Sequence, residues 1–188
     1  MIALPPRARM LSLLVLVAVF TVTAHATGIS ATATYTDTLA SPGVYDSSIT
    51  LNDAGTTTIG TFWFGWVPGA GFLSATPTSI GSPTGWTDKT TNAGKAIQWT
   101  TSTPLTAGDS LSGFSFDSTE TPAQMLLDFT GTGTGSGDPV TTSTVYAGAP
   151  LVGTADEFVA TVTPEPSSIL LLLTGAGLLG FTKRMARA

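Results

Sequence analysis

The stretch Ser-Ala-Thr-Ala-Thr-Tyr-Thr-Asp-Thr, at residues 30–38, repeats threonine at every second position. Because alternate side chains of a β-strand point to opposite faces, Thr32, Thr34, Thr36 and Thr38 would share one face. Alternation of this kind is typical of a strand with one face in solvent. Flat threonine arrays also occur on ice-binding surfaces, but they need the same pattern on neighbouring strands, and we find no such repeat. We therefore predict a half-exposed strand.

The segments that follow also have the composition of strands. Thr, Val, Ile and aromatic residues are frequent, Gly, Pro, Asn and Asp interrupt them, and no long stretch keeps a helical period. This pattern predicts an all-β domain built as one β-sandwich, of the immunoglobulin-like or jelly-roll type. The expected strands are 30–38, 47–51, 57–67, 86–90, 96–101, 110–116, 125–129, 141–146 and 157–162. The turn Asn52-Asp53-Ala54-Gly55 is expected to join two of them as a hairpin, and residues 131–139 form a loop by composition.

An aromatic run, FWFGW at residues 62–66, lies in one expected strand. On a strand, Phe62, Phe64 and Trp66 would share one face, and Trp63 would lie on the other. A Trp63 in solvent could stack on a sugar ring, as exposed aromatics do in carbohydrate-binding sandwiches. A Trp63 in a strand covered on both faces would belong to the core, which the large area that aromatics bury favours. The same core role is expected for two later tryptophans, Trp86 and Trp99.

Several short motifs in this region resemble those of bacterial immunoglobulin-like surface modules. They are GW at 85–86, IQW at 97–99, LTAGDS at 105–110 and FSF at 114–116. The resemblance implies a sandwich domain that works outside the cell.

The middle of the chain, residues 27–162, is strongly acidic. It holds eleven Asp or Glu but only two bases, Lys89 and Lys95, which gives a formal charge of −9. A surface this poor in cations cannot neutralise a phosphate backbone, which excludes nucleic acid as a partner. The chain has no cysteine, so no disulfide stabilises the domain.

Catalytic and metal sites are hard to build from this composition. The one histidine, His25, precedes the expected cleavage site, and cysteine is absent, so the commonest general base and the thiol nucleophile are missing. Asp156 and Glu157 form a candidate carboxylate pair, but neighbours on a strand face opposite ways. The acid-and-glycine turns at 52–53 and 135–138 carry groups that hold calcium, yet we expect ordinary turns. We expect no enzyme activity, cofactor or metal; a glycosidase that uses carboxylates alone is the remaining catalytic alternative.

The N-terminal part, residues 1–26, has the layout of a cleavable secretory signal. Arg7 and Arg9 precede an apolar stretch at 11–22, and small residues follow at the positions that a signal peptidase reads. Cleavage is expected between Ala26 and Thr27, with Ala24 as the other small residue. An uncleaved anchor helix is the alternative.

The C-terminal part, residues 163–188, contains an acid between two prolines, an apolar run and a basic end. Pro164 and Pro166 push the residue before each toward extended geometry, which presents the Glu165 carboxylate on a stiff peptide. A helix at 169–181 would be about 20 Å long, shorter than a bilayer core of about 30 Å. Its apolar members are Ile169, Leu170, Leu171, Leu172, Leu173, Leu178, Leu179 and Phe181. The basic residues that follow match the positive-inside rule for a segment whose N-terminal side is exported, and they are Lys183, Arg184 and Arg187.

Pro164-Glu165-Pro166, the short apolar helix and the basic end together resemble the PEP-CTERM sorting signal of bacterial envelope proteins. The same tail is also catalogued as an ice-binding protein C-terminal domain. In the PEP-CTERM family, a membrane protease called an exosortase recognises the tail and releases the protein or transfers it to the surface. Two departures from the usual pattern are Thr163, where a hydrophobic residue is common, and the loose spacing of the bases.

The sequence thus predicts a signal peptide at 1–26, a β-sandwich at 27–162 and a sorting signal at 163–188. We expect an exported, non-catalytic protein that is anchored transiently in the cytoplasmic membrane and then reaches the cell surface or the extracellular matrix of a biofilm. Its expected role is structural or adhesive, alongside exopolysaccharide, and the alternative is a carbohydrate-binding module. The expected partners are a signal peptidase, an exosortase and exopolysaccharide.

Overall fold

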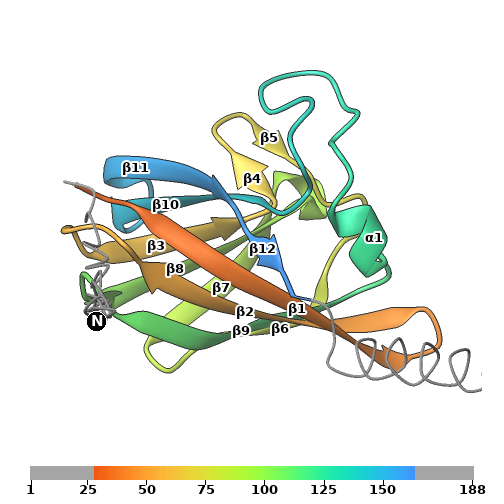
Figure 1. Ribbon diagram of the computed structural model, residues 1–188, viewed down its shortest axis with the longest axis horizontal. Helices are drawn as coiled ribbons and strands as arrows, with labels where there is room; N and C mark the ends of the chain where they lie inside the picture. Colours follow the sequence, from red (N-terminus) through yellow and green to blue (C-terminus); the bar gives the residue numbers. More distant parts are fainter. Residues whose placement is uncertain (1–27, 164–188) are drawn as a thin grey trace, which may run out of the picture.

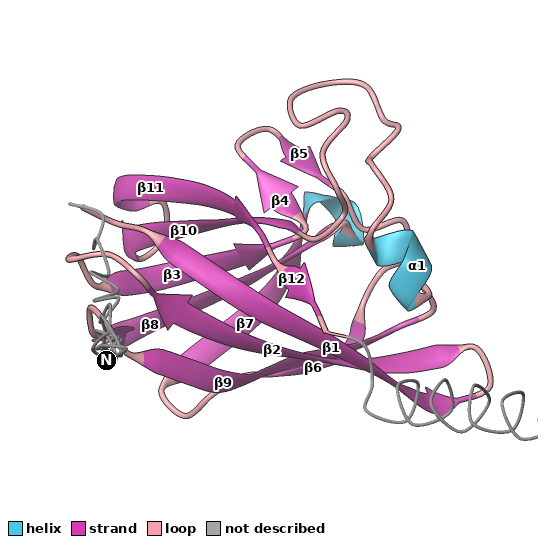
Figure 2. Cartoon of the chain, viewed as in Figure 1, coloured by secondary structure: helices cyan, strands magenta, loops and turns pink. Residues whose placement is uncertain are grey.

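The computed structural model describes residues 28–163, and within them the chain forms two five-stranded β-sheets. The expected signal peptide and cleavage site, the Pro164-Glu165-Pro166 motif, the membrane helix and the basic end lie outside the described residues. Figure 1 shows the two sheets packed face to face, and Figure 2 shows how little helix the fold contains. The prediction of an all-β sandwich is therefore confirmed.

The first sheet, sheet A, carries both ends of the described chain. Its strand order is β12-β1-β2-β9-β6, and all neighbours are antiparallel except β1 and β12, which are parallel. The strands are β1 (Ala31–Ser41), β2 (Val44–Asp53), β6 (Thr78–Gly81), β9 (Ser110–Ser118) and β12 (Thr161–Val162).

The second sheet, sheet B, has the order β11-β10-β3-β8-β7 and is antiparallel throughout. Its strands are β3 (Ile59–Phe64), β7 (Trp86–Thr91), β8 (Ala96–Leu105), β10 (Thr142–Gly148) and β11 (Val152–Val159). A small hairpin of β4 (Trp66–Val67) and β5 (Ala70–Gly71), a 3-10 turn (Asn92–Gly94) and a one-turn helix α1 (Pro122–Met125) complete the fold. No helix between residues 28 and 163 is long and apolar enough to cross a membrane.

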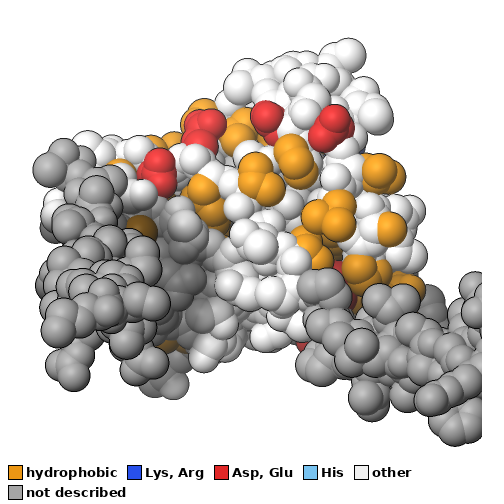
Figure 3. All heavy atoms as spheres, viewed as in Figure 1, with side chains coloured by type: hydrophobic (Ala, Val, Ile, Leu, Met, Phe, Trp, Pro, Cys, Tyr) orange, Lys and Arg blue, Asp and Glu red, His pale blue; other side chains and the backbone are white. Residues whose placement is uncertain are grey.

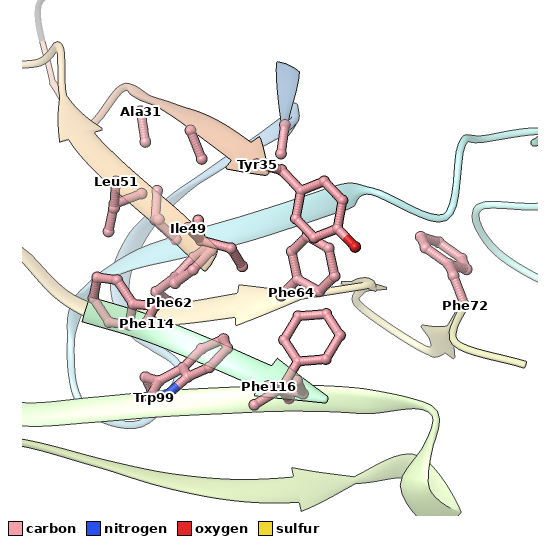
Figure 4. Close-up of a cluster of buried hydrophobic side chains, with 14 of the residues drawn as sticks. Ala31, Tyr35, Ile49, Leu51, Phe62, Phe64, Phe72, Trp99, Phe114 and Phe116 are labelled. Carbon is pink, nitrogen blue, oxygen red and sulfur yellow. The ribbon is translucent and has the colours of Figure 1, made fainter. Parts of the chain in front are cut away.

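Aromatic side chains from both sheets fill the space between them (Figure 4). Phe114 of sheet A meets Phe62, Trp86 and Trp99 of sheet B edge-on, with ring centroids 5.2 to 5.3 Å apart. Edge-to-face pairs of this kind add to the free energy that burial of the rings supplies. The core interpretation of Trp86 and Trp99 is confirmed, because both are buried in this cluster.

The predicted hairpin at 52–55 is wrong, because β2 and β3 belong to different sheets. Asp53 is buried, and its Oδ1 accepts the N–H of Gly55 at 2.9 Å, which turns the chain out of sheet A. The neighbouring N–H groups of Ala54 and Thr56 donate to Ser30 and Gly28 instead of closing a ladder with β3. A turn motif predicts a reversal of the chain, but the reversal here leads to the other sheet.

The strand predicted at 125–129 is also wrong, because α1 ends at Met125 and beyond it only Asp128 forms an isolated β-bridge, with Pro139. Thr121 caps this helix: its hydroxyl accepts the N–H of Gln124, and the Gln124 side chain accepts the N–H of Thr121. Pro122 occupies the first helical position, where the missing N–H costs nothing. This capping box favours a helical turn at Met125, the first residue of the predicted strand.

The other predicted strands exist with shifted ends. The segment predicted at 57–67 divides into β3 and β4 at Gly65, whose φ of +64° lies in the left-handed region that glycine adopts without strain. The segment predicted at 157–162 divides into the end of β11 and β12 around Ala160. Two short strands, β5 and β6, were not predicted.

Candidate functional site

The outer face of sheet A carries almost only short side chains with hydroxyl or amide groups, and we call it the hydroxyl face. On β1 the inward residues are buried, whereas every second residue from Thr32 to Thr38 points outward and is half-buried or exposed. The same alternation holds on β2 and β9. The hydroxyl face consists of Thr32, Thr34, Thr36, Thr38, Ser48, Thr50, Asn52, Ser110, Ser112, Ser115, Thr161 and Thr163.

Strand register aligns these side chains in rows across the sheet. One row runs through Thr161, Thr34, Thr50 and Ser112, from β12 to β9. A second row contains Thr32, Asn52 and Ser110, and a third contains Thr36, Ser48 and Ser115. The threonine pattern itself is not repeated on β2 and β9, but serine and asparagine at the matching positions extend the rows of hydroxyl and amide groups across the sheet.

Hydrogen bonds tie neighbouring members of the hydroxyl face together. The Thr36 and Thr163 hydroxyls lie 2.9 Å apart, and Ser110 Oγ donates to Asn52 Oδ1 at 2.6 Å. Each hydroxyl can donate one hydrogen bond and accept two, so these contacts leave most of the bonding capacity free for solvent or a ligand. A hydroxylated polymer that lies across the strands would meet donors and acceptors at every step.

The hydroxyl face has little charge. Two acids, Asp46 and Asp117, lie beside it as register partners at one end, and neither lysine of the described chain lies on its strands. Figure 3 shows one side of the molecule, with acidic side chains along its upper part, almost no basic side chains, and a white area of backbone and other side chains in the middle of the view. This chemistry suits an uncharged or weakly charged partner rich in hydroxyl groups.

Trp63, the candidate for sugar stacking, is 6% exposed and does not present an open ring to solvent. It lies on the outer side of β3 and stacks on Trp66, with ring centroids 4.1 Å apart, in a small cluster with Ala96 and Tyr146. Gly65 with its positive φ places Trp66 beside Trp63. The prediction that Trp66 shares a face with Phe62 and Phe64 is therefore wrong, whereas the core interpretation of Trp63 is confirmed in this separate cluster.

The carboxylates singled out in the sequence do not converge. Asp156 pairs with buried Val145, and its Oδ2 accepts the N–H of Ala31 at 2.9 Å. Glu157 pairs with Thr144 on the next step of the ladder, so the two acids take opposite faces as predicted.

The turns considered for calcium have internal partners. Burial raises the pKa of Asp53, whose Oδ1 accepts the N–H of Gly55. In the loop after Phe129, the N–H of Asp138 donates to the carbonyl of Gly135. Among residues 28–163, no three His, Cys, Asp or Glu side chains lie close enough to hold a metal ion.

The outer face of sheet B carries a second hydroxyl-lined feature. An open groove of about 580 Å³ lies beside β7 and β8, and Thr87, Thr100 and Thr101 line part of it. Thr87 and Thr100 are register partners, and their hydroxyls lie 3.3 Å apart. Replacing this pair is therefore a matched control for replacing a threonine pair of the hydroxyl face.

Sequence reasoning missed most of the hydroxyl face. The alternation in β2, where Ser48, Thr50 and Asn52 point outward, was visible in the sequence. The partnership of Thr161 with Thr34 was not, because it depends on the parallel pairing of β12 with β1.

Comparisons with known proteins add little. No family model and no curated protein match the chain. Among solved structures, a GH20 exo-β-N-acetylglucosaminidase from Vibrio harveyi matches with 11% identity and a TM-score of 0.40, both as an inactive mutant and in complex with N-acetylglucosamine. Each match covers 71% of this chain but only 18% of the enzyme. Neither the fold nor the activity of that enzyme transfers to this chain at such similarity.

Proposed function

We propose that this chain is an exported, non-catalytic protein of the cell surface or extracellular matrix, and that its hydroxyl face contacts a neutral exopolysaccharide. The observation that carries the proposal is the set of neutral hydroxyl rows across β12, β1, β2 and β9. The finer assignment of the sandwich as immunoglobulin-like or jelly-roll-type belongs to the same proposal.

The export part of the proposal rests on the sequence. A signal peptidase would cut after Ala26, and an exosortase would recognise Pro164-Glu165-Pro166 with the apolar run at 169–181 and the basic end. The chain would be held at the cytoplasmic membrane in transit and would then reach the surface. A protein exported in this way would meet polymers rich in hydroxyl groups outside the cell.

The charge of the domain selects among polysaccharides. Residues 27–162 carry a formal charge of −9, so an anionic polymer such as alginate would be repelled over the whole surface. A neutral glucan meets no such barrier. Single hydroxyl contacts are weak because each exchanges for contacts with water, but a polymer engages many of them at once.

The non-catalytic part of the proposal follows from the groups that remain after export. The expected mature chain has no histidine or cysteine. The adjacent carboxylates Asp156 and Glu157 lie on opposite faces of β11, so they are not placed to act together as general acid and general base.

Co-sedimentation of the full-length protein with an insoluble neutral β-glucan tests the proposal. Thr34 and Thr50 are register partners on the hydroxyl face, and replacing both with valine keeps the β-branched shape while removing two hydroxyls. At about 0.5–1.5 kcal/mol for each hydrogen bond, we expect affinity to fall about tenfold.

The matched control is the Thr87→Val, Thr100→Val pair on sheet B, which makes the same chemical change on the other side of the sandwich. It should bind the glucan as the unmodified chain does. Equal binding by the Thr34→Val, Thr50→Val protein, or loss of binding only in the sheet B control, would show that the hydroxyl face is not the contact surface.

A further inference from the structure

A cavity of about 340 Å³ opens beside α1, away from the residues assigned to the hydroxyl face. Its walls are mostly apolar, and Phe72 and Phe129 form part of them with ring centroids 5.0 Å apart. Leu73, Leu127 and Val140 complete the apolar lining. The volume is that of a site for a small organic molecule, such as one sugar ring or a short alkyl chain.

One buried carboxylate also lines this cavity. Glu120 follows β9 and is 3% exposed. Its Oε1 accepts three hydrogen bonds, from the N–H and the hydroxyl of Ser74 and from the N–H of Ala75, the last two at 2.7 Å. The side chain is therefore held in one orientation by the segment that follows Leu73.

The second oxygen of the Glu120 carboxylate, Oε2, differs from the first. Glu120 Oε2 is buried and has no hydrogen-bond partner among the described residues. Buried polar atoms are nearly always paired, because an unpaired one loses its hydration without compensation. On this side neither a donor nor solvent compensates the charge of the Glu120 carboxylate.

The surroundings indicate which charge a ligand of this cavity would carry. Asp128 and Lys95 are exposed side chains of the same cavity, so with Glu120 its formal charge is −1. The hydroxyl of Tyr35 points toward the side of the core where Phe72 lies (Figure 4), and it is hydrogen-bonded to Asp37, so a further carboxylate lies behind this wall. A cationic ligand is therefore favoured over a neutral one.

A metal ion fits this site less well than an organic cation. No group of three acidic or imidazole side chains gathers anywhere in residues 28–163, whereas calcium takes six to eight oxygen ligands. An ammonium group needs fewer partners, and aromatic faces such as those of Phe72 and Phe129 attract it.

We propose that this cavity binds a primary ammonium group carried on a compact body, with the buried Glu120 carboxylate as its counter-charge and the phenylalanine wall packing on the body. The chemistry has two sources, an amino sugar with a free amine and a small alkylamine. The proposal does not depend on the hydroxyl face, and either can fail alone.

Isothermal titration calorimetry of the full-length protein with glucosamine and with n-butylamine tests the proposal; glucose and N-acetylglucosamine are the neutral counterparts of the first, and n-butanol is that of the second. We expect at least one amine to bind at least tenfold more tightly than its neutral counterpart. Glucosamine alone would identify a sugar site, and butylamine would identify an alkylamine site. Equal binding of both amines and their neutral counterparts, no binding of either amine, or saturable binding of calcium in their place would overturn the proposal.

The Glu120→Gln variant removes the charge but keeps an oxygen that can accept from Ser74 and Ala75. It should weaken amine binding at least tenfold, whereas Glu157→Gln, the same change at an exposed site on β11, should alter it less than twofold. The Lys95→Gln variant should strengthen binding, because it removes a competing cation from the same cavity. Unchanged affinity in a folded Glu120→Gln protein would refute the assignment.

A measurement on the unmodified chain covers the case in which Glu120→Gln does not fold. The amide resonances of Ser74 and Ala75 report on the carboxylate directly, because both N–H groups donate to it. They should shift on addition of the amine that binds and not on addition of its neutral counterpart. Amine binding without a shift at either amide would place the ligand elsewhere and overturn the proposal.

Discussion

Tyr35 is a buried tyrosine whose hydroxyl ends in a small polar cluster, and its replacement should change how stability depends on pH. The side chain is fully buried and stacks on Phe64, with ring centroids 5.5 Å apart. Its hydroxyl donates to Asp37 Oδ1 at 2.5 Å and lies 2.9 Å from Ser47 Oγ. Burial and then the hydrogen bond to Asp37 raise the pKa of Tyr35 far above 10.

The sign of the effect follows from the two states. Below about pH 10 the phenol is neutral in both the folded and the unfolded chain, so the contribution of Tyr35 is complete. Above that pH the unfolded chain loses the proton while the folded chain keeps it. The free energy of unfolding therefore falls by about 1.4 kcal/mol for each further pH unit on account of this group.

The Tyr35→Phe variant removes both the hydrogen bond and the titration. At pH 7 we expect it to be less stable than the unmodified chain by about 1.5–3 kcal/mol, the usual value for a hydrogen bond to a charged group. Between pH 10 and pH 12 the unmodified chain loses about 2.7 kcal/mol that the variant cannot lose. The two proteins should therefore have nearly equal stability at pH 12.

Urea unfolding followed by tryptophan fluorescence at pH 7, 9, 11 and 12 measures the difference. Ser47→Ala is the matched control, because it removes a second donor to Asp37 without removing a group that titrates. Its deficit should stay constant across the alkaline range. If the Tyr35→Phe deficit were also constant from pH 9 to pH 12, the argument from burial would fail.

Three further predictions concern other parts of the chain. Trp63→Ala should lower the free energy of unfolding by about 3–5 kcal/mol, because Trp63 is packed against Trp66, and denaturant unfolding would detect this; a folded protein of normal stability would contradict its core role. Gly135→Ala should weaken amine binding severalfold by calorimetry, because the residue has φ +78° and a Cβ there would strike the Phe72 ring; unchanged affinity would separate this loop from the cavity. Glu165→Ala should leave thermal unfolding unchanged while uncleaved precursor accumulates in the producing cell, as seen by immunoblot; normal processing would contradict the sorting assignment.

Local patterns predicted the strands well, because burial on one face leaves a period of two in the sequence. The alternation of β1 is an example: Ala31, Ala33 and Tyr35 are buried and the threonines between them are not. The same reasoning failed at Gly65 and at Thr121, where one residue changes the backbone direction or caps a helix. A single glycine or threonine carries too little signal to outweigh an apolar run around it.

The candidate sites were harder to predict, because each is assembled by pairings between distant segments. The hydroxyl face requires β12 to join β1, so Thr161 gains its neighbours only when the chain has crossed the sandwich several times. The Glu120 cavity likewise depends on Ser74, on a segment that no strand pattern marks. A lone glutamate after a strand has no signature in the sequence, and its leftover oxygen is visible only in three dimensions.

The period of two on β1 also makes the proposed surface and the core separable by experiment. Thr34 points outward between Ala33 and Tyr35, which point inward, so a change at Thr34 alters the hydroxyl face without touching the packed rings. Tyr35→Phe changes the core and its pH dependence without removing a hydroxyl from the surface. If Thr34→Val, Thr50→Val altered glucan binding only in proportion to a loss of stability, the hydroxyl face would not be the glucan-binding surface. We expect Thr34→Val, Thr50→Val to lose glucan binding at unchanged stability, and Tyr35→Phe to lose stability at unchanged glucan binding. Together these two results would assign glucan binding to the hydroxyl face.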